Sequence, residues 1–245
     1  MKLLGIDVSK WQGKIDWARV KNYGFDFAMV RVGTGTSSLN VDNTALYNIA
    51  ECNRLGIPVG VYYYSYSYTA EQAARLTRDV MEWIKKNKVQ LQYPVAFDIE
   101  YDDCHIKAGR AVNTAKCKQA MQVIESYGYY GIIYASDNFF RKYLDLSKLQ
   151  VYDKWIAAYR GADNIGIPHG MWQYSSKGSI PGVNGDVDKD VAYKDYAAII
   201  KRAGLNQIKS EDVYKITVDP VSSGDKNRIV DLLKQLKLNF TVTKK

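Results

Sequence analysis

Short apolar runs rich in valine, isoleucine and aromatic residues recur along the chain, and in its first half they alternate with segments of helical periodicity. Runs of this length and composition predict β-strands, and apolar residues spaced three and four apart predict amphipathic helices. A strand followed by a helix, repeated, is typical of a parallel sheet wrapped by helices. The predicted strands cover 2–8, 25–33, 57–67, 93–100, 129–136, 154–161, 170–176 and 186–192, and the predicted helices cover 41–56, 70–87 and 113–128.

Glycines end the helical segments. Gly24, Gly56, Gly128 and Gly204 each follow a helical run, where a left-handed glycine releases the chain toward the next strand. The strands are almost continuously apolar, which indicates that both of their faces are buried. The pattern therefore predicts an α/β fold, a TIM-like (β/α) barrel. We expect it to be irregular, because the later units lack full helices.

The pattern changes after the last of these glycines. Residues 207–245 contain an apolar run (VYKITV), a Pro-Ser-Ser-Gly turn, a helical segment (KNRIVDLLKQLK) and a second apolar run (NFTVTK). We therefore predict a barrel over 1–206 and a small C-terminal βαβ-type module over 207–245. The module is too short to build a core alone, so we expect it to pack on the barrel, to bind the target surface or to form a homodimer with a second copy.

Composition limits the classes of function. Hydrophobic residues make up 47% of the chain and charged residues 24%, and no window approaches the roughly 18 uninterrupted apolar residues of a membrane span. The apolar run at the amino terminus meets Asp7 too soon for a secretory signal peptide. The net charge of +8 favours an anionic partner, but the basic residues are scattered and match no nucleic-acid motif. We expect neither nucleic acid nor membrane as a partner.

The cysteines and histidines give no signal for a cofactor or a metal. Three cysteines at irregular spacing are too few for a disulfide framework or a zinc site. The two histidines, His105 and His169, are far apart in the sequence and have no cysteine at ligand spacing. We therefore expect free thiols, no metal site and no cofactor.

The strongest chemical signal is the stretch YPVAFDIEYDD, residues 93–103. Asp98 and Glu100 are two apart in a strand, so both side chains project from one face, with Cα atoms roughly 6.6–6.8 Å apart. They stand at the carboxyl end of the fourth predicted strand, where barrels collect catalytic residues. Two close carboxyl groups in a desolvated cleft raise the pKa of one of them, which glycosidic bond cleavage requires. A solvated strand end or a salt bridge is the alternative.

Other acids stand at the ends of the first and last strands. Asp7 ends the first strand, and Asp186, Asp188 and Asp190 gather around the last one. These two strands become neighbours when a barrel closes, so the acids would face the same cleft as the pair. Asp7 alone could equally cap the turn that follows it.

Aromatic residues also gather at predicted strand ends. Rings with a polar tip suit a sugar, whose C–H face packs on the ring while its hydroxyl groups form hydrogen bonds. Isolated tyrosines more often belong to the core or the rim. The residues concerned are Tyr62, Tyr64, Tyr66 and Tyr68 on the third strand and its exit, Tyr134 on the fifth, and Trp172 and Tyr174 on the seventh.

At these residues the chain resembles family 25 glycoside hydrolases, the Chalaropsis-type lysozymes that include many bacteriophage endolysins. The matching pieces occur in order across about 3–205, and the tail is not covered. They are GIDVSKWQG, FAMVRVGTG, GIPVGVYYYSYS, PVAFDIE and MWQYSSKGSIPGVNGDVDKDV. The resemblance implies an N-acetylmuramidase that cleaves the β-1,4 bond between N-acetylmuramic acid and N-acetylglucosamine in peptidoglycan, with retention of configuration.

The resemblance also implies roles for residues. Glu100 would be the general acid and then the base. Asp98 would either attack the anomeric carbon or orient the substrate's own acetamido group, and we favour the second. Asp7 and Asp188 would position the substrate. Arg31 stands where a lysine is expected and keeps its charge with a different geometry, which puts substrate contacts in doubt. The aromatic residues expected to bind substrate are Tyr62, Tyr64, Tyr134 and Trp172.

The resemblance further implies the peptidoglycan of a Gram-positive bacterium as substrate, with anionic wall polymers as a further partner. For a phage enzyme without a signal peptide, we expect location in the host cytoplasm and then, after release through a holin pore, at the cell wall. Two alternatives remain: a carbohydrate-binding barrel without catalysis and a chitinase-type hydrolase. The intact acid pair disfavours the first, and the first and last motifs disfavour the second.

Overall fold

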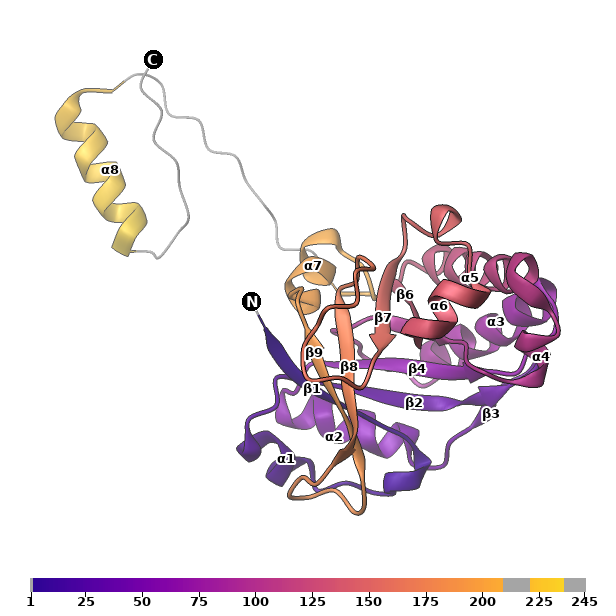
Figure 1. Cartoon of the computed structure of the whole chain (residues 1–245). Coiled ribbons are helices and arrows are strands. Elements are labelled where there is room, and N and C mark those ends of the chain that lie inside the picture. Colours follow the sequence, from indigo (N-terminus) through magenta and orange to yellow (C-terminus); the bar gives the residue numbers. More distant parts are fainter. Residues whose placement is uncertain (1, 209–220, 236–245) are drawn as a thin grey trace. The chain divides into compact units, whose positions relative to one another are not determined.

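The computed structural model describes residues 2–208 and 221–235 (Figure 1). By its internal contacts the chain divides into two units, Met1–Glu211 and Asp212–Lys245, which are described separately. In the described part of the chain, no helix has the length and apolar character needed to span a membrane.

Eight strands of the first unit close into a barrel. Seven of them run parallel, and β9 is antiparallel to both of its neighbours, β1 and β8. The pairing of β1 with β2 closes the ring, and a short strand, β3 (Asn40–Val41), adds to the edge of β2. The barrel strands are β1 (Leu3–Val8), β2 (Phe27–Gly35), β4 (Val59–Ser65), β5 (Val95–Asp98), β6 (Gly131–Ser136), β7 (Asp153–Ala157), β8 (Met171–Gly178) and β9 (Val187–Ala192).

Alternation along the strands separates two cores. On β5, Val95 and Phe97 belong to the outer core under the helices, whereas Ala96 belongs to a cluster inside the barrel. The inner cluster is tightly packed at Gly60, where an added Cβ atom would lie 2.6 Å from the sulfur of Met29. This packed interior fills the barrel below the strand ends, as in other TIM-like barrels, and leaves the carboxyl ends to carry the site.

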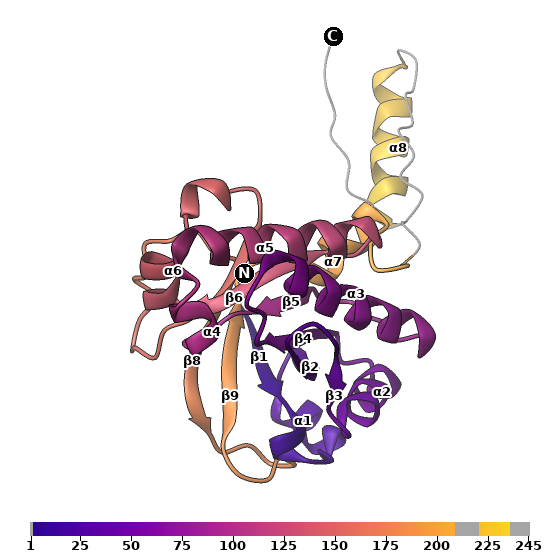
Figure 2. The same cartoon turned by 90° about the vertical axis from the view of Figure 1, so that its right-hand side faces the viewer.

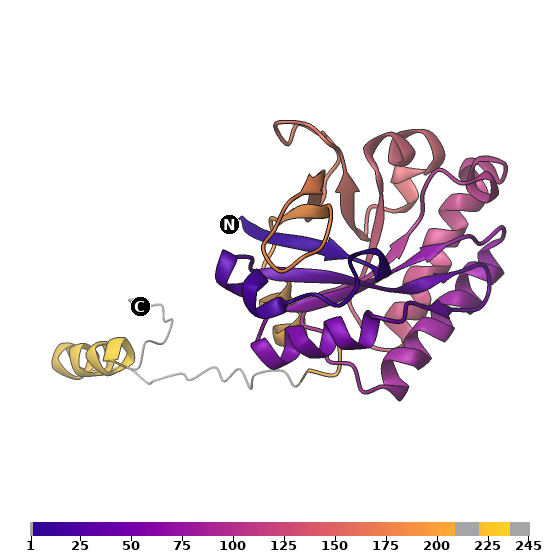
Figure 3. The same ribbon diagram turned by 90° about the horizontal axis from the view of Figure 1, so that it is seen from below.

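Helices cover the outside of the barrel (Figures 1, 2 and 3). The α3 helix begins with a capping box between Thr69 and Gln72 and buries Leu76, Val80 and Ile84 at spacings of four. The helices of the barrel unit are α1 (Trp17–Tyr23), α2 (Ala45–Leu55), α3 (Ala70–Lys86), α4 (Asp103–Ile106), α5 (Gly109–Ser126), α6 (Asp137–Tyr143) and α7 (Tyr196–Ala203), with 3-10 turns η1 (Lys10–Gln12) and η2 (Leu146–Lys148).

The glycines that were predicted to end helices do so. Gly24, Gly56 and Gly204 are the C-caps of α1, α2 and α7 and have left-handed backbone angles. Gly128 follows the end of α5 and also has a positive φ, of 77°. All three helices predicted from periodicity are present, as α2, α3 and α5.

The later part of the barrel is irregular, as predicted. The stretches 158–170, before β8, and 179–186, before β9, contain no helix. The sequence pattern predicted a parallel sheet, and β9 departs from it. Eight residues link β8 to β9, fewer than the dozen or more that a parallel crossover needs, so β9 returns as a hairpin partner of β8.

The described part of the second unit is one helix, α8 (Ser223–Gln235). It overlaps the helix predicted over 226–237, and Ser222 caps its start by accepting a hydrogen bond from the backbone N–H of Asp225. The apolar runs 213–218 and 239–244, predicted as strands, lie outside the described residues. The division into modules 1–206 and 207–245 stays a prediction.

Candidate active site

The acid pair stands at the carboxyl end of β5, a strand flanked by β4 and β6 (Figure 2). Asp98, the last residue of the strand, is 1% exposed, and Glu100 is half-buried. Glu100 lies just beyond the end of β5, and its carboxyl group is hydrogen-bonded to that of Asp98. Apart from this contact, the buried Oδ1 atom of Asp98 accepts no hydrogen bond within the described part of the chain.

Burial and neighbouring charges keep a proton on this pair. Burial and the charge of Asp102 raise the pKa of Glu100 to about 7. Burial and the charge of Glu100 also raise the pKa of Asp98, while the charge of Arg31 opposes that rise. Two carboxyl groups in contact titrate as a unit, so near neutral pH the pair holds a proton beside a carboxylate.

Arg31 is fixed beside the pair by a second acid. Its Nε atom donates to Oδ2 of Asp42 at 2.8 Å, and both side chains are largely buried. The same oxygen accepts the backbone N–H of Lys10 at 3.0 Å, which ties the turn after β1 to β2. Arg31 lies near enough to Asp98 for their charges to attract. The prediction that Arg31 stands at the site is consistent with this position.

Gln173 joins the acid of the first strand to two tyrosines. Its Nε2 atom donates to Oδ2 of Asp7 at 2.7 Å. Its Oε1 atom accepts from the hydroxyl groups of Tyr134 and Tyr159, each at 2.9 Å. An amide in the middle of this network fixes the orientation of each partner, because each of its hydrogen-bonding atoms is directed at a named group.

Two acids of β9 face the same interior. In the pairing of β1 with β9, Asp7 lies opposite Asp188, and Asp190 is two residues further along the same face. Asp190 is fully buried, and its Oδ1 atom accepts from Nε1 of Trp155 at 2.8 Å. Burial raises the pKa of Asp188 to about 6 and that of Asp190 to about 8. The predicted meeting of first-strand and last-strand acids is confirmed.

The tyrosines of β4 and of the segment that follows it run from the barrel interior outward. Tyr62 is 9% exposed and meets the ring of Trp155 edge-on. Tyr64 donates its hydroxyl hydrogen to Asp102 at 2.7 Å, and its ring lies 4.9 Å from that of Tyr66. Tyr66 and Tyr68 are 41% and 57% exposed. The alternation predicted for this row therefore places one end in the core and the other in reach of solvent.

Trp172 corrects a prediction. We expected it at the cleft, but it lies on the opposite face of β8 from Gln173 and belongs to the outer core under the helices. Its ring N–H donates to the backbone oxygen of Ala158 at 2.8 Å. The side chain that β8 directs toward the acids is the adjacent Gln173, whereas Trp172 packs in the core.

Several site residues carried no signal in the sequence analysis. Gln173 and Tyr159 belong to no motif of acids, and Asp42 and Asp102 stand in polar loops where an acid is ordinary. Asp190 is one of the strand-end acids, but the sequence pattern alone gives it no role. Gln173 could have been found from its position next to Trp172 in a predicted strand, because neighbouring side chains of a strand point to opposite faces.

The histidines have structural partners. Nε2 of His105 pairs with the backbone oxygen of Ser65 at 2.8 Å, and its Nδ1 atom lies 3.1 Å from Nζ of Lys116. His169 contacts the backbone of Ile167 and the side chain of Asp163. Over residues 2–208 and 221–235, no group of three or more histidine, cysteine and acidic side chains is arranged to hold a metal ion.

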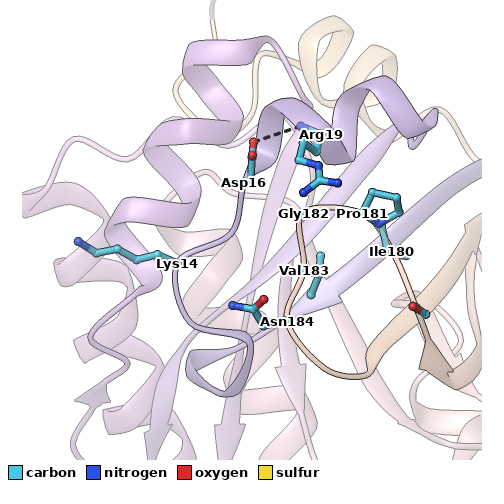
Figure 4. A pocket seen from close by; sticks show the side chains of 9 residues that line it. Lys14, Asp16, Arg19, Ile180, Pro181, Gly182, Val183 and Asn184 are labelled. Atoms are coloured by element: carbon cyan, nitrogen blue, oxygen red, sulfur yellow. Dashed lines mark hydrogen bonds between the residues drawn. The ribbon is translucent and has the colours of Figure 1, made fainter.

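Two hollows of the barrel unit are lined by other residues. One, of about 450 Å³, lies between the start of α1 and the link from β8 to β9, with Lys14, Arg19 and Asn184 around it (Figure 4). The other, of about 600 Å³, is lined by residues within 84–92, 127–129 and 206–208. Neither includes the acid pair, so the chemistry of the strand ends identifies the site.

The strand ends thus combine a proton-holding acid pair, a fixed cation and further oriented acids, which is the equipment for cleaving a glycosidic bond. The sequence matches the model of the glycosyl hydrolases family 25 over residues 6–183. The chain belongs to this family. It is a glycoside hydrolase, and the matched residues include Asp7, Asp98, Glu100 and Gln173, while Asp188 lies just beyond them.

Relatives in family 25 include proteins named as lysozymes. The chain is 25% identical to "Lysozyme M1" of Streptomyces globisporus over 202 residues, covering 76% of this chain and 66% of that protein. It is 30% identical over 196 residues to an uncharacterized protein, YegX, of Escherichia coli K12, covering 76% of this chain and 68% of that one.

Solved structures of the family share the fold. The modular autolysin LytC of Streptococcus pneumoniae, in complex with a synthetic peptidoglycan ligand, matches with a TM-score of 0.70 and 28% identity over 78% of this chain. The match covers 47% of LytC, so this chain spans about half of that protein. The catalytic domain of endolysin ply40 from Listeria monocytogenes phage P40 matches with a TM-score of 0.69 and 24% identity, over 82% of this chain and 97% of that domain.

Proposed function

We propose that this chain is an N-acetylmuramidase. It hydrolyses the β-1,4 bond between N-acetylmuramic acid and N-acetylglucosamine in peptidoglycan, with retention of configuration. The observation that carries the proposal is the Asp98–Glu100 pair, buried, in contact and holding a proton near neutral pH at the carboxyl end of β5. The lysozyme relatives and the peptidoglycan-bound LytC structure support peptidoglycan as the substrate.

Glu100 acts first as an acid and then as a base. It is the half-buried member of the pair and reaches the cleft, and its pKa of about 7 lets it hold a proton at neutral pH. It donates this proton to the glycosidic oxygen as the bond from the anomeric carbon breaks. In the second step it removes a proton from the attacking water and returns to its starting state.

The contact between the two carboxyl groups favours attack by the substrate's own acetamido oxygen. Nucleophile and acid flank the sugar in a direct mechanism, with carboxyl groups about 5–5.5 Å apart. The hydrogen bond between Asp98 and Glu100 brings their carboxyl groups closer together than this separation. Asp98 instead has a buried, unpartnered Oδ1 atom, suited to accept the acetamido N–H and turn the acetamido oxygen toward the anomeric carbon. Water then opens the cyclic intermediate with retention.

The test is digestion of purified Gram-positive peptidoglycan and, in parallel, of chitin, with mass analysis of the products and NMR of the first anomer formed. We expect muropeptides that end in reducing N-acetylmuramic acid, initially as the β-anomer, and little release from chitin. Fragments ending in reducing N-acetylglucosamine, equal turnover of chitin, or no cleavage of several walls by the folded protein would each contradict the proposal.

We also propose a biological role as a phage endolysin, with residues 207–245 binding an anionic wall polymer or a second copy of the chain. The basic balance of these residues, eight Lys and Arg against five Asp and Glu, is compatible with an anionic wall. Expressed in the bacterial cytoplasm, the chain should lyse cells only when a holin is co-expressed. Lysis without a holin would contradict release through a holin pore.

A further inference from the structure

A second pair of carboxyl groups is buried in the barrel, separate from the Asp98–Glu100 pair. Asp7 on β1 is 3% exposed and Asp190 on β9 is fully buried. The strands run antiparallel, and both side chains point into the barrel, where the two carboxyl groups form a hydrogen bond. A hydrogen bond between two carboxyl groups requires a proton on one of them.

Each member of the second pair is also held from outside. Gln173 donates to Oδ2 of Asp7 at 2.7 Å, and Trp155 donates to Oδ1 of Asp190 at 2.8 Å. The Oδ2 atom of Asp190 is buried and, apart from the contact with Asp7, has no hydrogen-bond partner in the described structure. These donors hold one oxygen of each carboxyl group in a fixed position.

The surroundings of the second pair disfavour two negative charges. Asp188, on the same face of β9, repels both carboxylates. Tyr62 and Tyr134 pack from β4 and β6, are themselves buried, and feel the charge of Asp7. Arg31 is paired with Asp42 and is not among the charges that act on the pKa of Asp7 or Asp190. Burial accordingly raises the pKa of Asp190 to about 8, and burial with the charges of Asp190 and Asp188 raises that of Asp7.

We propose that Asp190 is a positioning residue of the active site: it shares one proton with Asp7 and, together with Gln173, holds the Asp7 carboxyl in one orientation at the cleft. Asp190 has no access to substrate and acts only through Asp7. The role of Asp7 toward the substrate rests on the proposed function, whereas the proton shared with Asp190 does not.

The pair predicts how stability depends on pH. A carboxyl group whose pKa is raised by folding binds its proton more tightly in the folded state, so stability falls as pH rises from the unfolded pKa, near 4, toward the folded one. Asp190→Asn preserves the shape and leaves one carboxyl group with amide donors. The melting temperature of the wild type should therefore fall between pH 5 and pH 8 more steeply than that of the variant, by roughly 2–5 °C per pH unit.

The experiment measures thermal unfolding of the whole chain from pH 5 to pH 9 for the wild type, Asp190→Asn and Glu125→Gln. Glu125 is an exposed acid of α5 and serves as the control, which should follow the wild type. Contributions of Asp98 and Glu100 are common to all three proteins and cancel in the comparison, whereas Asp188 interacts with Asp190, so a change in its pKa is part of the measured difference. If the melting temperatures of Asp190→Asn and the wild type change with pH in the same way, the claim that Asp7 and Asp190 share a proton is wrong. If Asp190→Asn does not fold, Asp7→Asn must flatten the curve by a similar amount.

The same proteins are assayed on peptidoglycan across this pH range. Asp190→Asn should lower kcat/KM about tenfold at pH 8 and less at pH 5, because acid restores the proton to Asp7. A loss equal at every pH, or no loss, would overturn the positioning role, since a merely structural effect does not follow this titration. If the wild type cleaves no peptidoglycan, the proposed function fails, and the unfolding curves still decide whether the proton is shared.

Discussion

The barrel contains two pairs of buried carboxyl groups that differ in access to the cleft. Glu100 is half-buried, whereas Asp7 and Asp190 are 3% and 0% exposed. Burial raises pKa values in both pairs, so a raised pKa does not by itself mark a proton donor. A donor must also reach the leaving group. The pair with an open member can transfer its proton, and the closed pair can only hold one.

The largest expected effect comes from removing the open acid. Glu100→Gln should lower turnover of peptidoglycan by about 10²–10⁴-fold, because the amide cannot protonate the leaving oxygen. The fold should persist, since the change removes a partly desolvated acid beside Asp98 and Asp102. Reducing-end release and the melting temperature measure both, with Glu125→Gln as the matched exposed control. A variant retaining more than a tenth of wild-type turnover would show that another group donates the proton.

A loss nearly as large is expected for Asp98→Asn, about 10²-fold or more, because an amide oxygen is a poorer acceptor for the acetamido N–H than a carboxylate. Walls whose muramic acid has been N-deacetylated sharpen the test. The wild type should leave their glycan bonds intact, since the attacking oxygen is missing. Efficient cleavage of such walls would favour direct attack by Asp98.

Arg31 interacts with both Asp98 and Asp42, and its substitution should have an intermediate effect on activity. Its charge opposes the rise in the pKa of Asp98. Arg31→Met should therefore lower kcat/KM about tenfold and move the acid limb of the pH profile to higher pH, because Asp98 then keeps a proton longer. Arg31→Lys keeps the charge and should keep the limb in place, with a weaker hold on Asp42. Identical limbs for Arg31→Met and wild type would contradict this account.

The smallest effect on activity is expected at Trp172. Trp172→Phe removes the hydrogen bond to Ala158 and part of the outer core, so stability should fall by about 1–2 kcal/mol. The value of kcat/KM at a temperature below the transition should stay within about twofold of the wild type. Unchanged stability with a tenfold loss of activity would show that Trp172 acts at the cleft and would contradict its structural role.

The sequence pattern predicted the barrel well because its signals are local. Each of the eight barrel strands lies where the sequence pattern predicted one, and glycines end α1, α2 and α7 as predicted. The direction of β9 was not predicted. Strand direction depends on the length of the preceding link, and a run of acids and valines looks the same in either direction.

The sequence pattern predicted the site residues whose positions follow from their spacing. It missed those whose roles depend on tertiary contacts. Asp98 is the last residue of β5, as the strand pattern predicted, and Glu100 follows two residues later, just beyond the strand. The sequence analysis predicted Trp172 at the cleft and assigned no role to Gln173, and only the register of β8 tells which of the two faces the acids. Asp42 acquires its role from Arg31 across two strands, which no local pattern shows.

The central claim is that the Asp98–Glu100 pair donates its proton near neutral pH. The most direct test is the pH dependence of kcat/KM for the wild type on soluble peptidoglycan fragments, which reports the ionisations of the free enzyme. Because Glu100 must be protonated and its pKa is about 7, kcat/KM should fall about tenfold per pH unit above that value. A profile that stays flat, or rises, between pH 7 and pH 9 would contradict the claim.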